Sequence, residues 1–140
     1  MKEDILEQLT DDYLQARGYF TRHNIKFAPD SNHPEFNSRK DSNHSDIDVV
    51  GFNPTLSGPE RVLAVSCKSW QSGFHPARRI KKMQDGGIIG GRKAWKAFRE
   101  LAKPKWAEAF RDKIYQLTGS HELTYVTAVT KVKGDKAVWE

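Results

Sequence analysis

Two apolar strands joined by a turn-forming segment constrain the fold of this 140-residue chain more than any other feature. The stretch from Ile47 to Phe52 is rich in apolar and β-branched residues, and residues 62–65 read Val-Leu-Ala-Val. Both patterns are typical of buried strands. Residues 53–59 between them contain two prolines and one glycine, which favour a turn. The sequence therefore predicts a β-hairpin.

An amphipathic helix is expected before the hairpin. Ile5, Leu9 and Tyr13 recur every four residues, and Leu6 and Leu14 widen the same apolar stripe. The glycine at position 18 is expected to stop this helix, because glycine readily adopts the left-handed conformation found after helix ends.

The rest of the chain completes an α/β fold class. The expected elements are a short strand over residues 19–27, a loop over 28–45, a basic and glycine-rich segment over 73–91, helical faces at 95–102 and 104–119, a strand over 123–132, and a turn at 133–135 into a last strand ending at Trp139. The predicted order is αβββ, then helices, then β. This order is typical of a central mixed sheet flanked by helices.

Size and composition fit one domain over residues 1–140. With 37% hydrophobic residues the chain can bury one core, and the sequence leaves open whether it is a fragment of a longer chain. The single cysteine excludes an internal disulfide and a zinc site built on paired cysteines. No apolar run approaches the roughly 18 residues of a membrane span, and no signal-peptide pattern is present, so a cytoplasmic protein is expected.

Charge is distributed unevenly along the chain. Residues 1–60 contain 6 Lys/Arg and 11 Asp/Glu, whereas residues 61–140 contain 17 and 7. A basic half suits a polyanionic partner, and clustered carboxylates suit the cations that phosphate chemistry requires. The same distribution also fits a basic protein whose charges are simply solvated.

Residue parity brings chemically useful side chains together on the hairpin. Side chains alternate faces along a strand, so Asp46 and Asp48 share a face, as do Ser66 and Lys68 on the partner strand. If the turn is centred near Leu56, Asp48 lies within side-chain reach of Lys68. Carboxylates bind Mg²⁺, and a lysine stabilises the charge that develops during phosphodiester hydrolysis. Taken singly, these residues also fit strand-end acids and a lysine that reaches towards solvent.

The segments Ser45-Asp46-Ile47-Asp48-Val49-Val50-Gly51 and Val65-Ser66-Cys67-Lys68 resemble the PD-(D/E)xK nuclease superfamily, which includes restriction endonucleases and Holliday junction resolvases. Asp48 corresponds to the family aspartate and Lys68 to its lysine. The resemblance implies a restriction-endonuclease-like αβββαβ core. It also implies a Mg²⁺-dependent endonuclease, with Mn²⁺ as a substitute, that hydrolyses phosphodiester bonds in duplex or branched DNA.

The same resemblance suggests further roles. Glu7 lies in a stretch similar to the family's first helix and is a candidate metal ligand, although an acid near a helix start also complements the helix dipole. Asp46 and the backbone carbonyl of Cys67 are further candidate ligands. Gln71 is similar to polar residues that orient the attacking water or contact phosphate. Many such nucleases dimerise to cut both strands, which makes a homodimer or another protein subunit a candidate partner, and the sequence leaves the oligomeric state open.

One position departs from the family pattern. Ser66 occupies the catalytic position where an acid is expected, and a hydroxyl is a much poorer Mg²⁺ ligand than a carboxylate. Some relatives, such as the Mrr-like restriction enzymes, carry a neutral glutamine there. Two functions stay open: an active endodeoxyribonuclease in which Asp46 or Glu7 compensates, and a weakened or inactive DNA-binding module on a nuclease scaffold. An RNA-directed or protein-interaction domain is a third class, but the chain has no RNP-type stacking motif.

Basic residues after the hairpin are expected to contact the DNA backbone. They are Arg78, Arg79, Lys81, Lys82, Arg92, Lys93 and Lys96. A solvated helix face is the alternative for each of them. The glycine-rich stretch at 86–93 lacks the Lys-Ser/Thr ending of a nucleotide-binding loop, and the histidines lack compact ligand spacing. The sequence therefore excludes a nucleoside triphosphatase and disfavours a zinc enzyme.

Overall fold

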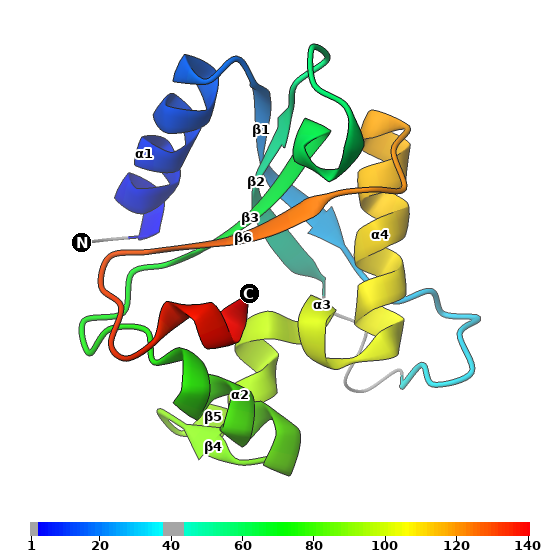
Figure 1. Cartoon of the computed structure of the whole chain (residues 1–140). Helices are drawn as coiled ribbons and strands as arrows, with labels where there is room; N and C mark the ends of the chain where they lie inside the picture. The colour runs from blue at the N-terminus through cyan, green and yellow to red at the C-terminus, as the bar shows by residue number, and fades with distance from the viewer. Residues whose placement is uncertain (1–2, 38–43) are drawn as a thin grey trace.

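A four-stranded mixed sheet forms the centre of the α/β structure, a computed structural model that describes residues 3–37 and 44–140 (Figure 1). The strands are β1 (Phe20–Phe27), β2 (Ser45–Phe52), β3 (Val62–Lys68) and β6 (Thr124–Val129), in the spatial order β1-β2-β3-β6. β2 pairs antiparallel with β1 and β3, and β3 pairs parallel with β6. The predicted hairpin and the mixed sheet are confirmed.

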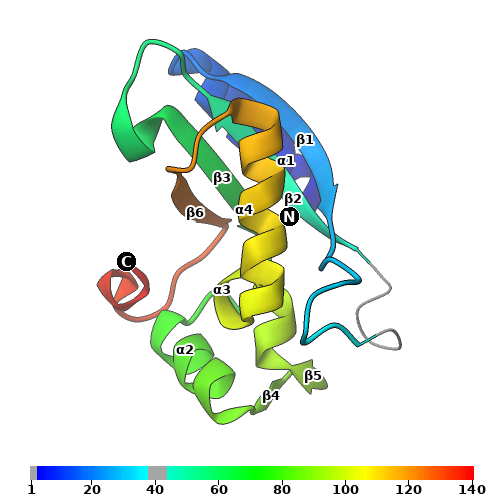
Figure 2. The same ribbon diagram turned by 90° about the vertical axis from the view of Figure 1, so that its right-hand side faces the viewer.

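The two long helices lie on opposite faces of the sheet. Figure 2 shows α4 (Pro104–Thr118) in front of the strands and α1 (Glu3–Ala16) behind them. The parallel β3–β6 pair requires a crossover connection, and α4 belongs to that connection. The smaller elements are η1 (Gly58–Arg61), α2 (Pro76–Asp85), β4 (Ile88–Ile89), β5 (Arg92–Lys93), η2 (Ala94–Phe98), α3 (Arg99–Ala102) and η3 (Lys136–Trp139).

The core under α4 follows from the spacing of its apolar residues. Trp106, Phe110 and Ile114 recur every four residues and are buried against the sheet. Phe27 of β1 meets the rings of Trp106 and Phe110 edge-on, at centroid distances of 5.9 and 5.6 Å. Gly119 caps the helix with φ of 71°, a left-handed conformation that glycine adopts readily.

The core under α1 is smaller and corrects one expectation. Leu6 and Leu14 are buried, whereas Ile5, Leu9 and Tyr13 are 49%, 51% and 60% exposed. The helix is confirmed, but the Ile5–Leu9–Tyr13 part of its apolar stripe is not buried: Leu9 and Tyr13 border a hollow whose other side is formed by β3 and β6. The sheet residues that Leu6 and Leu14 meet are Val49, Val65 and Cys67.

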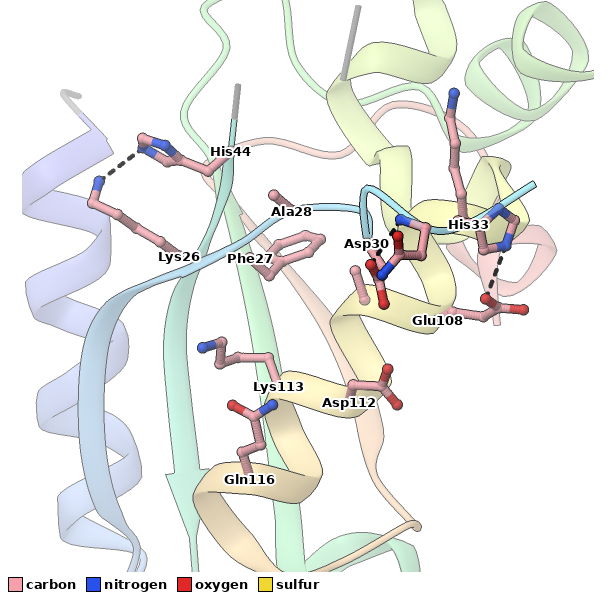
Figure 3. A pocket seen from close by; sticks show the side chains of 13 residues that line it. Lys26, Phe27, Ala28, Asp30, His33, His44, Glu108, Asp112, Lys113 and Gln116 are labelled. Carbon is pink, nitrogen blue, oxygen red and sulfur yellow. Dashed lines mark hydrogen bonds and ion pairs between the residues drawn. The ribbon is translucent and has the colours of Figure 1, made fainter. Parts of the chain in front are cut away.

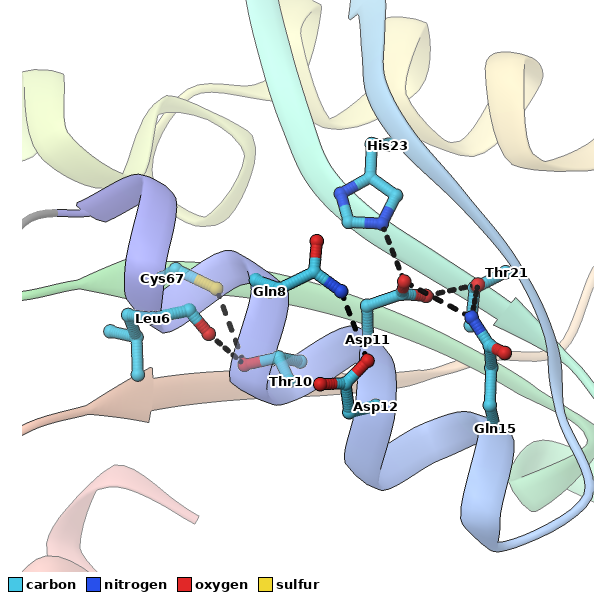
Figure 4. Close-up of polar contacts among 9 residues, drawn as sticks. All are labelled: Leu6, Gln8, Thr10, Asp11, Asp12, Gln15, Thr21, His23 and Cys67. Atoms are coloured by element: carbon cyan, nitrogen blue, oxygen red, sulfur yellow. Dashed lines mark hydrogen bonds and ion pairs between the residues drawn. The ribbon is translucent and has the colours of Figure 1, made fainter.

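A polar network explains how α1 is rotated (Figure 4). Asp11 lies three residues before Leu14, on the same side of the helix, and is 7% exposed. Its carboxylate accepts hydrogen bonds from Thr21 and, at 3.1 Å, from Gln15, and it lies 3.2 Å from His23. These bonds, that from Thr21 most of all, hold the pKa of Asp11 below its usual value despite burial.

Three segments differ from the sequence prediction or extend it. The basic segment 73–91 contains the helix α2, which was not predicted, and the final strand ending at Trp139 is wrong because those residues form η3. Asp135 starts η3 by accepting a hydrogen bond from the amide of Ala137. Of the expected loop at 28–45, residues 38–43 lie outside the described residues.

Within the described part of the chain, no helix combines the length and apolar character needed to cross a bilayer.

Candidate active site

A hollow of about 350 Å³ lies where β2 and β3 meet η2 and α3. We call it the carboxylate pocket. It is lined by His44, Ser45, Asp46, Asp48, Ser66, Lys68, Trp70, Arg92, Lys96, Ala97, Arg99 and Glu100. The four hairpin residues that the sequence was expected to bring together, Asp46, Asp48, Ser66 and Lys68, therefore line one pocket. Its walls carry both cationic and anionic side chains.

The strand register explains this convergence. Val49 pairs with Val65, so the same antiparallel register extended by one residue sets Asp48 opposite Ser66. A turn centred near Leu56, as the sequence suggested, is within one residue of this register.

Asp48 is held by the backbone of β3. The amide of Cys67 donates a hydrogen bond of 2.7 Å to Oδ2 of Asp48. The Cys67 side chain is 1% exposed and lies in the opposite core, under α1, near Thr10. Because a strand residue directs its N–H and C=O to the same neighbour, the Cys67 carbonyl is also expected on the Asp48 side.

Glu100 is the carboxylate that the sequence did not predict. It belongs to α3 and lines the carboxylate pocket together with Asp48. The hydroxyl of Tyr125 on β6 donates a 2.5 Å hydrogen bond to its Oε1. Nothing in the sequence around residue 100 distinguishes this glutamate from a solvated helix acid.

Tyr125 connects several residues of the pocket. Burial raises the pKa of its phenol strongly, and the negative charges of Glu100 and, more weakly, Asp48 act in the same direction. The hydroxyl of Ser66 hydrogen-bonds the phenol and opposes the shift. The phenol therefore stays protonated and donates to Glu100. Tyr125 pairs with Ala64, so strand parity between β3 and β6 was the one sequence signal that could have placed it here.

Lys68 lines the pocket and lies beside a buried aromatic residue. Its Nζ is 5.3 Å from the ring centroid of Phe98, which is fully buried. Phe98 packs in turn against Trp70, Phe74 and Trp139. The ring face attracts the ammonium group and keeps it beside the pocket.

The donor atoms fit a hard divalent cation. Among residues 3–37 and 44–140, no three His, Cys, Asp or Glu side chains are grouped closely enough to hold a metal ion by themselves. Mg²⁺, however, commonly binds through one or two carboxylates and completes its shell with waters and substrate phosphate. Asp48 and Glu100, with the Cys67 carbonyl, match that donor set.

The other predicted ligands lie elsewhere or are engaged. Asp46 lines the pocket but is paired with Lys26, at 3.5 Å, and its side chain is 42% exposed. Glu7 lies on α1, which packs on the other face of the sheet, and it does not line the carboxylate pocket. Gln71 is exposed and lines a neighbouring hollow.

The predicted DNA-binding residues divide into two groups. Arg92 and Lys96 line the carboxylate pocket, and Arg78, Arg79 and Arg92 line the neighbouring hollow. The others line neither: they are Lys81, Lys82 and Lys93.

A hollow of about 540 Å³ beside β1 and α4 offers a contrast (Figure 3). Its wall mixes lysines with acidic residues, and His33 pairs there with Glu108 at 2.9 Å. Asp48, Ser66 and Lys68 do not line it. The chemistry that the sequence predicts therefore belongs to the carboxylate pocket.

No protein-family model matches the chain, and no curated protein or solved structure matches it significantly.

Proposed function

We propose that this chain is a metal-dependent DNA endonuclease with a restriction-endonuclease-like αβββαβ core. One observation carries the proposal: Asp48, Lys68 and Glu100 line a single pocket although they come from three separate elements. Two carboxylates and a lysine are what phosphodiester hydrolysis with a divalent cation requires. The order α1, β1, β2, β3, α4, β6 supports the proposed core.

Each residue then has a definite task. Asp48, Glu100 and the Cys67 carbonyl would hold Mg²⁺, which supplies polarisation of the phosphate and a water of lowered pKa. The Cys67 amide orients Asp48, and the neutral Tyr125 hydroxyl orients Glu100. Lys68 stabilises the negative charge that develops on the phosphate oxygens.

A second candidate function depends on Ser66. Without an acid at that position, the same scaffold serves as a DNA-binding module that does not cut. Glu100 favours the enzyme, because it supplies a carboxylate to the same pocket from another element.

Cleavage of supercoiled and branched DNA tests the proposal. The chain is expected to cut with Mg²⁺ or Mn²⁺ and to stop cutting with EDTA. Lys68→Ala should reduce the rate by about 100-fold or more. Lys131→Ala, an exposed lysine that does not line the carboxylate pocket, is the control and should cut normally. DNA binding without cutting, unchanged by Lys68→Ala, would favour the binding module.

A further inference from the structure

A second hollow, of about 670 Å³, adjoins the carboxylate pocket. The two share Trp70, Arg92 and Ala97 as a common wall. We call this second hollow the arginine pocket. The two hollows are therefore direct neighbours.

The arginine pocket is positively charged. Arg78, Arg79 and Arg92 line it together with His75, and none of its described lining residues is acidic. The carboxylate pocket, in contrast, contains three acidic side chains. The two hollows thus suit different partners: a cation with its phosphate in one, and an anion alone in the other.

Arg79 is the feature that most requires an anion. It is 9% exposed, its guanidinium stacks over Trp70 at 4.3 Å, and it donates one 3.2 Å hydrogen bond to the Ala94 carbonyl. Among the described residues it has no carboxylate partner. Burial lowers its pKa, and the positive charges of Arg78 and Arg92 add to this effect. A buried cation that faces two others is unfavourable until an anion joins them.

The start of α2 adds partial positive charge beside the arginines. His75 is the N-cap residue of this helix, and its side chain makes no capping hydrogen bond. The first amides of a helix point outward and carry partial positive charge. Arg79, not the helix end, is the anchor of the site.

We infer that the arginine pocket binds a phosphate of the substrate strand next to the phosphate that is cut, with Arg79 held by Trp70 and Arg78 and Arg92 completing the contact. This inference rests on the proposed function for the position of the cut. The arginine pocket then fixes the register of the strand, so that the scissile phosphate lies between Asp48 and Lys68.

The test combines one protein variant with single neutral linkages in DNA. Short duplexes carrying one methylphosphonate at successive positions are titrated, in EDTA, with the wild-type chain, Arg78→Ala and Arg111→Ala. Arg78 is exposed, so its removal should leave the fold intact; Arg111 is an exposed control on α4 that lines neither hollow. The wild-type chain should bind more weakly when the methylphosphonate replaces any of a small set of phosphates. For Arg78→Ala, the replacement at one of these positions should no longer weaken binding.

Salt dependence gives a second reading of the same contact. Arg78→Ala should lower the slope of log affinity against log salt concentration by about 1, whereas Arg111→Ala should retain the wild-type slope. An unchanged slope and linkage profile in Arg78→Ala would overturn the inference. Coupling between Arg78 and one linkage without any Mg²⁺-dependent cutting would support the phosphate site while refuting the nuclease. Mg²⁺-dependent cutting without that coupling would support the nuclease while refuting the phosphate site.

Discussion

At the scale of single residues, the second carboxylate is the main surprise. Ser66 occupies the position where the family pattern expects an acid, and Glu100 lines the same pocket from α3. Both side chains interact with the hydroxyl of Tyr125, so they reach the same point. A carboxylate at position 66 and one at position 100 are therefore alternative sources of the same charge.

We expect a carboxylate at position 66 to replace the one at position 100. Glu100→Gln should reduce Mg²⁺-dependent cleavage by about 100-fold, because the cation loses a charged ligand. The double variant Ser66→Glu/Glu100→Gln should recover a large part of that loss. Single-turnover rates across Mg²⁺ concentrations measure both effects, with Glu122→Gln, an exposed glutamate that does not line this pocket, as the control. If Glu100→Gln cuts at the wild-type rate, Glu100 has no part in metal binding.

At the scale of elements, the hairpin was predictable and the rotation of α1 was not. Strand alternation has a period of two, so the sequence placed Asp46 with Asp48 and Ser66 with Lys68, and an assumed turn near Leu56 brought Asp48 within reach of Lys68. The helix pattern gave one wide apolar stripe, and only tertiary contacts decide that its Leu6–Leu14 edge is buried while Ile5, Leu9 and Tyr13 stay exposed. Asp11 contributes to that decision, because its bonds to β1 turn the Leu14 side inward.

Two leucines of α1 test this rotation as a matched pair. Leu14 is 3% exposed and Leu9 is 51% exposed. Leu14→Ala should lower the free energy of unfolding by about 2–5 kcal/mol, whereas Leu9→Ala should change it by about 0.5 kcal/mol or less. Denaturant unfolding measures both values. A loss for Leu9→Ala equal to or larger than that for Leu14→Ala would contradict the described rotation of the helix.

The Asp11 network predicts a specific dependence on pH. The folded-state pKa of Asp11 is lowered from 3.8, so its contribution to stability is complete above that value and disappears as pH falls through the folded pKa. At neutral pH, Asp11→Ala should cost about 1.5–3 kcal/mol in unfolding free energy. The gap between wild type and variant should narrow on acidification below about pH 4. Asp12→Ala, at an exposed neighbour, should show little loss, and a pH-independent gap for Asp11→Ala would contradict this account.

At the scale of the whole molecule, the site depends on contacts that are distant in the chain. The sequence predicted the mixed sheet, the long helix from Pro104 and the Asp48–Lys68 pairing, because each follows from a local period or register. Glu100 and Tyr125 were missed because they join Asp48 only when α3 and β6 pack against β3. The helix α2 was missed because Pro76–Asp85 contains only two large aliphatic residues, Ile80 and Met83, among four basic ones, so the segment was interpreted as part of a basic, glycine-rich stretch.

The structure also shows where the basic residues of the second half of the chain lie. The basic residues after the hairpin do not form one uniform surface: Arg78, Arg79 and Arg92 line the arginine pocket, while Arg92 and Lys96 reach the carboxylate pocket. The structure thus sets a basic hollow directly beside a pocket with carboxylates. A polyanionic strand and its cation fit this arrangement.

The most direct test of the central claim compares two aspartates on one strand. Asp46 and Asp48 both line the carboxylate pocket, but Asp46 is paired with Lys26, whereas Asp48 is held by the Cys67 amide. Nicking of supercoiled DNA with Mg²⁺ should fall by about 100-fold or more in Asp48→Asn and by less than about tenfold in Asp46→Asn. Wild-type nicking by Asp48→Asn, or no nicking by the wild-type chain, would contradict the account.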